Sequence, residues 1–328
     1  MDEIDKNIIF ELSVNYRVSY QTIAKKYNLS VNAVKKRIQK LKSDGIIRGG
    51  WLFPMNAMLG MENWVALVRT EDPIPSDAFL DGLGAHRSID SASILTDGSI
   101  LCFGHYAGAK GLEELGTFLR QTPGVTSVDF HTILAEPGKR RELSLSDLKV
   151  LRCLRQDPRM SISNISQNTR LTPRRIRKII QELIDDKGSE PELYLNWNSR
   201  GGSRPDQVSF KVSINWNLNA GGHTTFVIII RHEEGAEFRS KIINVLKEKY
   251  PFKFWYSYAS AFEPVIFCVF VVEHMREAGD IIETLRQTPE ILSANAIYGY
   301  PSRRYHSVVD EYFEELFKRL EDYVKKAD

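Results

Sequence analysis

The chain has 328 residues, of which 42% are hydrophobic and 26% are charged, and its formal net charge is +2. This length exceeds the about 100–200 residues of one domain and predicts at least two domains. The near-zero charge excludes overall basicity as a source of nucleic-acid affinity, so any such affinity must come from local clusters. The longest apolar runs, such as 226–230 and 265–272, are much shorter than the about 20 residues that cross a bilayer.

The remaining composition points to a cytoplasmic protein. The N-terminus is acidic and amphipathic, unlike a secretory signal. The three cysteines, Cys102, Cys153 and Cys268, form no Cys-x-x-Cys pair. This pattern favours a reducing compartment and argues against a disulfide framework or a cysteine-rich zinc site.

A three-helix pattern opens the chain. Asp2 is placed to cap a first helix that contains Ile4, Ile8, Ile9 and Leu12 at helical spacing. A polar break over 15–17 precedes a second helix, which Ser19 caps. The third helix begins after Ser30 and is predicted to bury Val31, Val34, Ile38 and Leu41. Its other face is cationic and polar and carries Asn32, Lys35, Lys36, Arg37, Gln39, Lys40 and Lys42. Gly45 then suits a helix C-cap that leads into a strand and a wing hairpin.

A strand–helix–strand–strand–helix–strand pattern follows the wing. The strands are predicted over 64–69, 89–95, 100–106 and 125–134, and the helices over 76–83 and 112–120. This order is the ferredoxin-like arrangement, in which both helices cover one face of a four-stranded antiparallel sheet.

The whole pattern then recurs in the second part of the chain. Asp5 aligns with Asp147, and the same offset of 142 pairs Arg17 with Arg159 and Leu41 with Leu183. The second ferredoxin-like pattern has strands over 225–231, 252–260, 265–272 and 291–300, with helices over 238–250 and 276–286. Such a period is too long for a solenoid, whose repeats run to about 20–50 residues, and indicates that a whole protein was duplicated.

The second three-helix pattern has the same kinds of helix cap and a third helix rich in arginine. Ser144 and Asp147 have capping-box spacing, Ser161 caps the second helix, and Pro173 suits the first position of the third. Thr172 caps this third helix, whose inner stripe is Ile176, Ile179, Ile180 and Leu183 and whose outer face carries Arg174, Arg175, Arg177, Lys178 and Gln181. Residues 191–217 are predicted to form two strands around a tip that contains Arg200 and Arg204. This tip is either an arm for the minor groove or DNA backbone, or an ordinary long hairpin turn.

Three helices with a tight turn before a cationic third helix match a winged helix-turn-helix, whose last helix enters the major groove of DNA. Lys and Arg attract phosphates, and Asn, Gln and Arg can read base edges. The candidate DNA-binding residues are Ser30, Asn32, Lys35, Lys36, Arg37, Lys40, Thr172, Arg174, Arg175, Arg177, Lys178, Arg200 and Arg204.

The order of these elements resembles the Lrp/AsnC (feast/famine) transcription regulators. The similarity lies in Ile4-Asp5, in residues 29–31 and 44–47 around the third helix, and in the Gly-Val segment 124–125. It implies an α+β fold of two fused units and a regulator that reads double-stranded DNA through paired third helices. The predicted parts are two winged helix-turn-helix domains at 1–53 and 139–222, two ferredoxin-like domains at 54–138 and 223–303, and a C-terminal helix at 304–328.

The same resemblance implies partners for the ferredoxin-like domains. In the family these domains dimerise through their sheets and can bind an amino-acid effector between subunits. The family's Thr-Gly and Asp pattern after the second strand is replaced here by 96–100 in one copy and 260–264 in the other. The family's dimerisation leads us to expect a homo-oligomer. Because the effector motif is replaced, the sequence does not decide whether a small-molecule effector binds.

An enzyme alternative uses the same scaffold. A related group with this tandem plan decarboxylates sirohaem and grips tetrapyrrole carboxylates through histidines and arginines. Candidates of these types are His86, Arg87, His105, His131, His223, Arg69 and Arg231. The run 86–90 departs from that group's motif, and the chain shows no glycine-rich phosphate loop, paired carboxylates or metal-ligand spacing. We therefore expect a binding protein without catalytic residues, cofactor or metal.

A third alternative is a protein-interaction scaffold whose helical modules have lost DNA binding. The strongly amphipathic tail over 305–326 supports it in part. This helix either covers the protein's own sheet or pairs with the same helix of a second chain.

Overall fold

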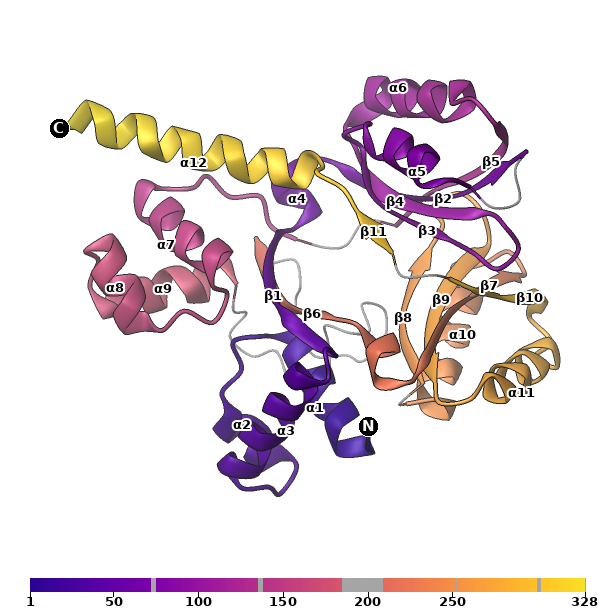
Figure 1. Cartoon of the computed structure of the whole chain (residues 1–328), viewed down its shortest axis with the longest axis horizontal. Helices are drawn as coiled ribbons and strands as arrows, with labels where there is room; N and C mark the ends of the chain where they lie inside the picture. The colour runs from indigo at the N-terminus through magenta and orange to yellow at the C-terminus, as the bar shows by residue number, and fades with distance from the viewer. Residues whose placement is uncertain (72–74, 135–137, 185–208, 252, 300–301, 328) are drawn as a thin grey trace. The chain divides into compact units, whose positions relative to one another are not determined.

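The computed structural model describes residues 1–71, 75–134, 138–184, 209–251, 253–299 and 302–327 (Figure 1). The chain forms two compact units, and neither unit is one half of the sequence. One contains Met1–Met58, Pro137–His223 and Glu314–Asp328, and the other contains Leu59–Glu136 and Thr224–Phe313. Each unit therefore combines corresponding parts of both repeat copies.

The first unit holds the two three-helix modules, which we call the winged-helix unit. Its helices are α1 (Glu3–Val14), α2 (Tyr20–Lys26), α3 (Val31–Ser43), α7 (Leu145–Gln156), α8 (Ile162–Thr169) and α9 (Pro173–Leu183). The predicted caps are confirmed, because Ser19, Ser30, Ser161 and Thr172 each accept a backbone N–H of the following helix. Asp2 and Ser144 form capping boxes with Asp5 and Asp147.

The tight turn before each third helix has the same backbone conformation in both copies. Asn28 and Arg170, which are equivalent in the repeat, both have left-handed φ values, +52° and +59°. This conformation is uncommon outside glycine. Its presence in both copies shows that the duplication preserved the backbone path of the turn as well as its apolar residues.

The predicted wing hairpin of the first copy is wrong. Strand β1 (Ile47–Pro54) pairs antiparallel with β6 (Phe210–Trp216) of the second copy, from Ile47 opposite Trp216 to Pro54 opposite Phe210. The two modules thus share a two-stranded sheet. Of the long hairpin predicted for the second copy, β6 is described, whereas the tip with Arg200 and Arg204 lies outside the described residues.

The second unit holds the two ferredoxin-like domains, and its predicted α+β fold is confirmed. The first domain has β2 (Glu62–Thr70), α5 (Asp77–Gly84), β3 (Ile89–Ile94), β4 (Ile100–Tyr106), α6 (Gly108–Gln121) and β5 (Val125–Thr132). The second has β7 (Thr224–His232), α10 (Ala236–Lys249), β8 (Phe254–Ala259), β9 (Val265–Val272), α11 (Met275–Arg286) and β10 (Ile291–Tyr298). The antiparallel strand orders β3-β4-β2-β5 and β10-β7-β9-β8 are those of the ferredoxin-like arrangement.

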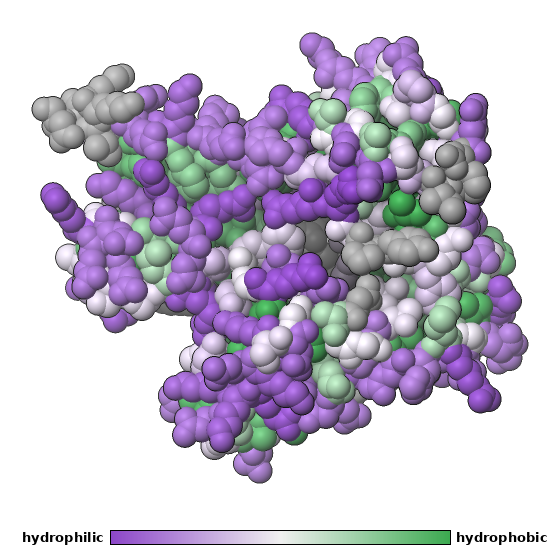
Figure 2. All heavy atoms as spheres, viewed as in Figure 1, coloured by the Kyte–Doolittle hydropathy of each residue, from purple (hydrophilic) through white to green (hydrophobic). Residues whose placement is uncertain are grey.

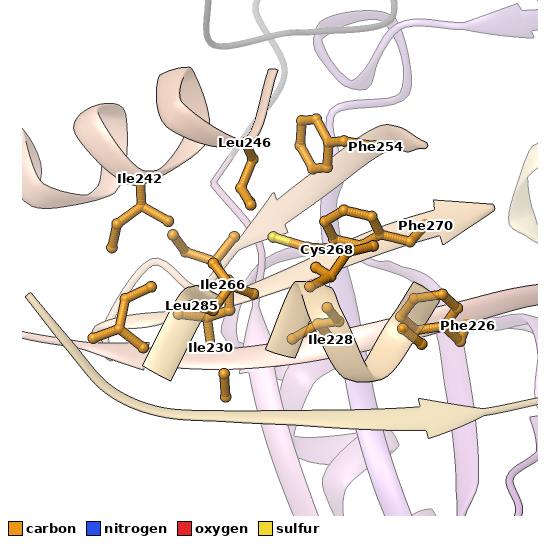
Figure 3. Packing of buried hydrophobic residues seen from close by; sticks show 14 of the residues in the cluster. Phe226, Ile228, Ile230, Ile242, Leu246, Phe254, Ile266, Cys268, Phe270 and Leu285 are labelled. Atoms are coloured by element: carbon orange, nitrogen blue, oxygen red, sulfur yellow. The ribbon is translucent and has the colours of Figure 1, made fainter. Parts of the chain in front are cut away.

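Each sheet buries one face beneath its own two helices. In the second domain Phe226, Ile228 and Phe270 meet Leu246 of α10 and Leu285 of α11, as Figure 3 shows. In the first domain α5 and α6 cover the equivalent face, which Figure 1 shows for the upper sheet. Cys102 and Cys268 occupy corresponding places in these cores, and burial raises the pKa of the Cys102 thiol to about 12. All three cysteines are free and buried, so they act as small core residues.

The opposite faces of the two sheets pack against each other. Their shared core includes Val65, Leu67 and Leu101 from the first domain and Val265 and Phe267 from the second. Two isolated bridges, Leu95 with Gly299 and Ile133 with Ser260, join the domains. Within the repeat Leu95 corresponds to Ser260 and Ile133 to Gly299, so the bridges are related by a pseudo-twofold axis. The sheet surface that we expected to join two chains is thus used inside one chain.

The C-terminal segment returns to the first ferredoxin-like domain before it forms a helix. Strand β11 (Arg303–Arg304) adds to the edge of β3. Tyr305 then lies against Gly84, where an added Cβ would come within 2.1 Å of the tyrosine ring. Helix α12 (Val308–Ala327) follows, and its apolar stripe at Val308, Val309, Phe313, Leu316 and Leu320 is buried within the chain. Among the described helices, none has the length and apolar character that a membrane crossing requires.

Candidate nucleic-acid interface

Helix α3 presents a polar face to solvent. Asn32, Lys35, Lys36 and Lys40 are exposed, and Val34, Ile38 and Leu41 are buried beneath them. Val31 is 36% exposed, so its predicted burial is wrong. Figure 2 shows mostly hydrophilic residues on the visible surface of the α1–α3 module, at the bottom of the view. Ser30 is exposed at the helix start, where its hydroxyl accepts the N–H of Ala33.

Arg37 differs from the other cationic residues of this helix. Its guanidinium donates hydrogen bonds to Asp2 Oδ2 at 2.7 Å and to Asp5 Oδ1 at 2.8 Å. Partial burial works to raise the pKa of Asp2, but the Asp5 N–H and Arg37 outweigh it and hold that pKa below its usual value. Arg37 therefore ties α3 to the start of α1 and has less freedom than its neighbours to reach DNA.

Replacing Arg37 with alanine should cost stability more than DNA affinity. We expect the free energy of unfolding to fall by about 1 kcal/mol, because a partly exposed double ion pair is lost. A depressed Asp pKa stabilises the fold above the unfolded pKa of about 3.9, and this contribution is lost as pH falls through the folded value. Denaturant titrations at pH 7 and at lower pH should show the difference from wild type shrinking; a constant difference would contradict the assignment.

Helix α9 carries an arginine-rich face at the equivalent place. Arg174, Arg177 and Lys178 are exposed, and Arg175 is partly buried. Thr172 is exposed and accepts the N–H of Arg175 as the N-cap. On the same helix Glu182 lies 2.9 Å from Arg141 and 3.7 Å from Lys178. The hydrogen bond from Arg141 lowers the pKa of Glu182 and keeps this carboxylate charged.

Two equivalent arginines join the helix-turn-helix modules to each other. Arg17 donates to the carbonyl oxygens of Pro158, at 2.7 Å, and Met160, at 3.1 Å. Arg159 donates in return to the carbonyl oxygens of Tyr16 and Val18. Because the two acceptors on each side are also equivalent in the repeat, the contact is an internal copy of an isologous dimer interface.

Aromatic packing supports this double contact, which we call the arginine clasp and define as Arg17, Arg159 and their four carbonyl acceptors. The Arg159 guanidinium lies 5.3 Å from the ring centroid of Tyr16 and 4.5 Å from that of Tyr20. Tyr16 in turn packs on Gly50 of β1, where an added Cβ would lie 2.3 Å from the ring. The repeat alignment of Arg17 with Arg159 was visible in the sequence, but nothing there indicated that each contacts the other module.

The histidines and arginines considered for an enzyme do not gather in one place. His223 belongs to the winged-helix unit, whereas His86, His105 and His131 belong to the ferredoxin-like unit. His86 packs on Phe118 with ring centroids 4.6 Å apart, and partial burial lowers its pKa. Arg87 pairs with Glu311, and Arg69 is exposed.

His105 and His131 each lie beside an aspartate. His105 Nδ1 is 2.7 Å from Asp90 Oδ2, and His131 Nε2 is 3.2 Å from Asp129 Oδ1. His131 is buried between the sheets, against Phe267. Arg231 lies 3.3 Å from Glu263 and 3.9 Å from Asp129. The residues around His131, namely Asp129, Arg231 and Glu263, come from both ferredoxin-like domains. Their positions in the sequence therefore gave no sign that they lie together.

Comparison with known proteins identifies the class of the helical modules. Residues 1–48 and 143–186 both match the family described as "Winged helix-turn-helix DNA-binding". The two matched segments begin 142 residues apart, at the offset of the internal repeat. The chain therefore contains two winged helix-turn-helix modules of the DNA-binding class.

The individual proteins that the chain matches are named as transcription regulators. An uncharacterized HTH-type transcriptional regulator of Pyrococcus abyssi is 45% identical over 49 residues, which is 15% of this chain and 33% of that protein. The regulator LrpA of Mycobacterium tuberculosis is 27% identical over 128 residues, or 38% of this chain and 85% of LrpA. The regulator LrpC of Bacillus subtilis is 26% identical and covers 42% of this chain and 93% of LrpC. The chain is thus similar to regulators named Lrp over about the length of one repeat copy, and it spans only about a third of the length of the first relatives it matches.

A solved structure shares the tandem fold. The siroheme decarboxylase NirDL aligns over 98% of this chain and 100% of its own, with a TM-score of 0.52 and 14% sequence identity. At this level of identity the match shows the arrangement of two winged helix-turn-helix and two ferredoxin-like domains in one chain, and it shows the fold alone.

Proposed function

We propose that this protein is a sequence-specific DNA-binding transcription regulator in which one chain supplies both halves of an Lrp/AsnC-type dimer. The observation that carries the proposal is the arginine clasp together with the shared β1–β6 sheet. These contacts hold two winged helix-turn-helix modules as an internal pair, each with an exposed cationic third helix. The chain then acts by binding, without catalytic residues.

The two third helices differ in chemistry, which supports an asymmetric binding site. The exposed groups of α3 are chiefly Lys and Asn, whereas those of α9 are chiefly Arg. Lysine acts as a point charge toward phosphate, whereas arginine can donate two hydrogen bonds to guanine in the major groove. We therefore expect the two half-sites to differ in sequence, with stronger base selection under α9.

Replacing Lys36 with alanine should weaken DNA binding and its dependence on salt. If Lys36 neutralises one phosphate, the slope of log K against log salt should shrink by about 1. Fluorescence anisotropy with a duplex at several salt concentrations measures both effects. Lys110, which is 88% exposed on α6 of the other unit, offers a matched control with the same loss of charge. An unchanged slope for Lys36→Ala, or an equal change for Lys110→Ala, would show that α3 does not contact phosphates.

Replacing Arg174 with alanine should also relax base preference. A good base contact contributes about 1–3 kcal/mol of discrimination. The ratio of affinities between the matched duplex and a duplex with one mismatched base pair should therefore fall about ten-fold or more. Binding to a panel of single-mismatch duplexes identifies the position affected. A uniform loss across all duplexes would instead assign Arg174 to the phosphate backbone.

A second candidate function has one specific observation in its favour. The fold resembles that of a siroheme decarboxylase along nearly the whole chain, and a related structure of NirDL was solved with an iron-uroporphyrin III analogue. His105 and His131 both lie on the sheet face opposite the helices, and each has an aspartate carboxylate within 3.2 Å. The departure of residues 86–90 from the expected motif weighs against this candidate.

An absorbance titration with iron-uroporphyrin III separates the two candidates. As a regulator, the protein should cause no saturable shift of the main porphyrin band. A saturable 1:1 shift that disappears in both His105→Ala and His131→Ala, while exposed His274→Ala retains it, would favour the enzyme and replace our proposal.

A further inference from the structure

A group of potential metal ligands lies where the two ferredoxin-like domains meet. Asp129 and His131 project from β5 of the first domain, and Glu263 comes from the β8–β9 turn of the second. One ligand atom from each side chain lies within 4.8 Å of the others. We propose that Asp129, His131 and Glu263 form a site for a divalent transition-metal ion of the Zn²⁺ class, which links the two domains.

The buried histidine is the strongest argument for this site. His131 is 2% exposed, and its Nε2 lies 3.2 Å from Asp129 Oδ1 but has no hydrogen bond of acceptable geometry among the described residues. A buried ring nitrogen that lacks such a bond is costly. A cation bound by Nε2 and the carboxylate would satisfy both groups at once.

The environment of His131 also provides the orienting contact that metal-bound histidines commonly have. Its other ring nitrogen, Nδ1, lies 3.3 Å from Ser260 Oγ. The same hydroxyl oxygen accepts the N–H of Glu263 at 3.2 Å. Ser260 therefore positions two of the three ligands, and an N–H at Nδ1 directed to this oxygen leaves Nε2 free to bind metal.

Charge and geometry suit a divalent ion of this class. One imidazole and two carboxylates are a set that Zn²⁺ accepts, and a fourth position remains for water. Tetrahedral binding needs ligand atoms about 3.4 Å apart, for bonds of about 2.1 Å. Asp129 and Glu263 have side chains 38% and 45% exposed. Both can therefore rotate and bring the ligand atoms, which now lie within 4.8 Å of one another, to the shorter distance that a metal ion needs.

Arg231 occupies the same neighbourhood and competes for the carboxylates. It lies 3.3 Å from Glu263 and 3.9 Å from Asp129, and its side chain is 47% exposed. A bound ion would displace this contact, and Arg231 can move into solvent. The competition gives a prediction with two opposite signs: loss of a ligand weakens metal binding, and loss of Arg231 strengthens it.

The pseudo-equivalent corner of the unit lacks the histidine and one of the two carboxylates. There the repeat places Asn295 and Ile297 for Asp129 and His131, whereas Asp97 stands for Glu263 and Arg69 for Arg231. The site is thus a product of divergence, and we expect one ion per chain.

The test uses the untagged full chain, metal-free, titrated with Co²⁺ and then with Zn²⁺. We expect one Co²⁺ per chain with visible absorption bands of low-symmetry coordination, and displacement by Zn²⁺ at equal stoichiometry. Glu263→Gln, an exposed change that leaves the core intact, should weaken Co²⁺ binding at least about ten-fold, and His131→Gln should do the same. Arg231→Gln should tighten binding, and the matched control Arg69→Gln should leave it unchanged.

The outcomes are separable. No Co²⁺ absorption at millimolar metal would overturn the proposal, as would binding that Glu263→Gln does not weaken. Melting temperatures of each variant without metal show whether His131→Gln still folds. If it does not, Glu263→Gln and Arg231→Gln decide the question.

Discussion

Replacing both Arg17 and Arg159 with alanine should loosen the spacing of the two winged helix-turn-helix modules, which the β1–β6 sheet still joins, and lower affinity for a two-half-site duplex at least about ten-fold. Simultaneous binding by linked modules can contribute about 10²–10⁴ to affinity, and it depends on a defined spacing between them. The arginine clasp sets this spacing through four hydrogen bonds to main-chain carbonyls. Affinity for a duplex with one half-site should stay nearly the same.

The same double variant should also lose stability. Hydrogen bonds from a charged donor contribute about 1.5–3 kcal/mol, so each single replacement should lower the unfolding free energy of the winged-helix unit by roughly that amount. Arg152 is a matched control in the same unit, because its side chain is 44% exposed and pairs with the similarly exposed Glu321 on the surface. Equal losses on one-site and two-site duplexes would contradict a spacing role and indicate general damage to the modules.

Replacing Phe270 with alanine should destabilise the ferredoxin-like unit by about 3–5 kcal/mol. The side chain is fully buried and packs against Phe226, Phe254 and Tyr250, with ring centroids 5.6, 5.4 and 6.1 Å away. Its removal leaves a cavity between β9 and α10 that the surrounding core cannot fill (Figure 3).

A matched change separates this effect from the loss of any aromatic residue. Phe262 is 86% exposed in the β8–β9 turn, so Phe262→Ala should change stability by no more than about 0.5 kcal/mol. Denaturant midpoints of both variants, measured beside wild type, check the prediction. A cost below 1 kcal/mol for Phe270→Ala would mean that this core is not packed as described.

Local patterns in the sequence predicted most of the fold. The helix caps at Ser30 and Thr172 and the alternating strands around Cys102 and Cys268 each follow from residues close together in the chain. The repeat strengthened these predictions of caps and strands, because the same spacing of residues occurs twice in the sequence. Val31 was the exception: it continues the helical period of Val34 and Ile38, but at the first helical position it lies beyond the core.

Contacts between the repeat copies could not be predicted in the same way. Strand β1 has no local signal for its partner β6, because the pairing joins residues such as Trp51 and Ser213 that are far apart in sequence. The sequence predicted a hairpin within each copy, but β1 of the first copy pairs with β6 of the second copy instead. The arginine clasp and the group around His131 were missed for the same reason.

The candidate DNA-reading residues were only partly distinguishable from sequence. Spacing placed Lys36, Arg37 and Lys40 together on the polar side of one helix. Only the structure shows that Arg37 turns to Asp2 and Asp5, while Lys36 and Lys40 remain exposed. Charge alone could not separate these roles, since an acidic partner from α1 has no fixed sequence relation to α3.

The most direct test of the central claim is an in vitro selection of binding sites from random duplex DNA with the purified full chain. An internal pair with a Lys-rich and an Arg-rich reader should select one bipartite site whose two halves differ, with centres about one helical turn apart. Arg174→Ala should degrade one half and leave the other. A palindromic site with halves of equal affinity, or selection of no site at all, would contradict the account.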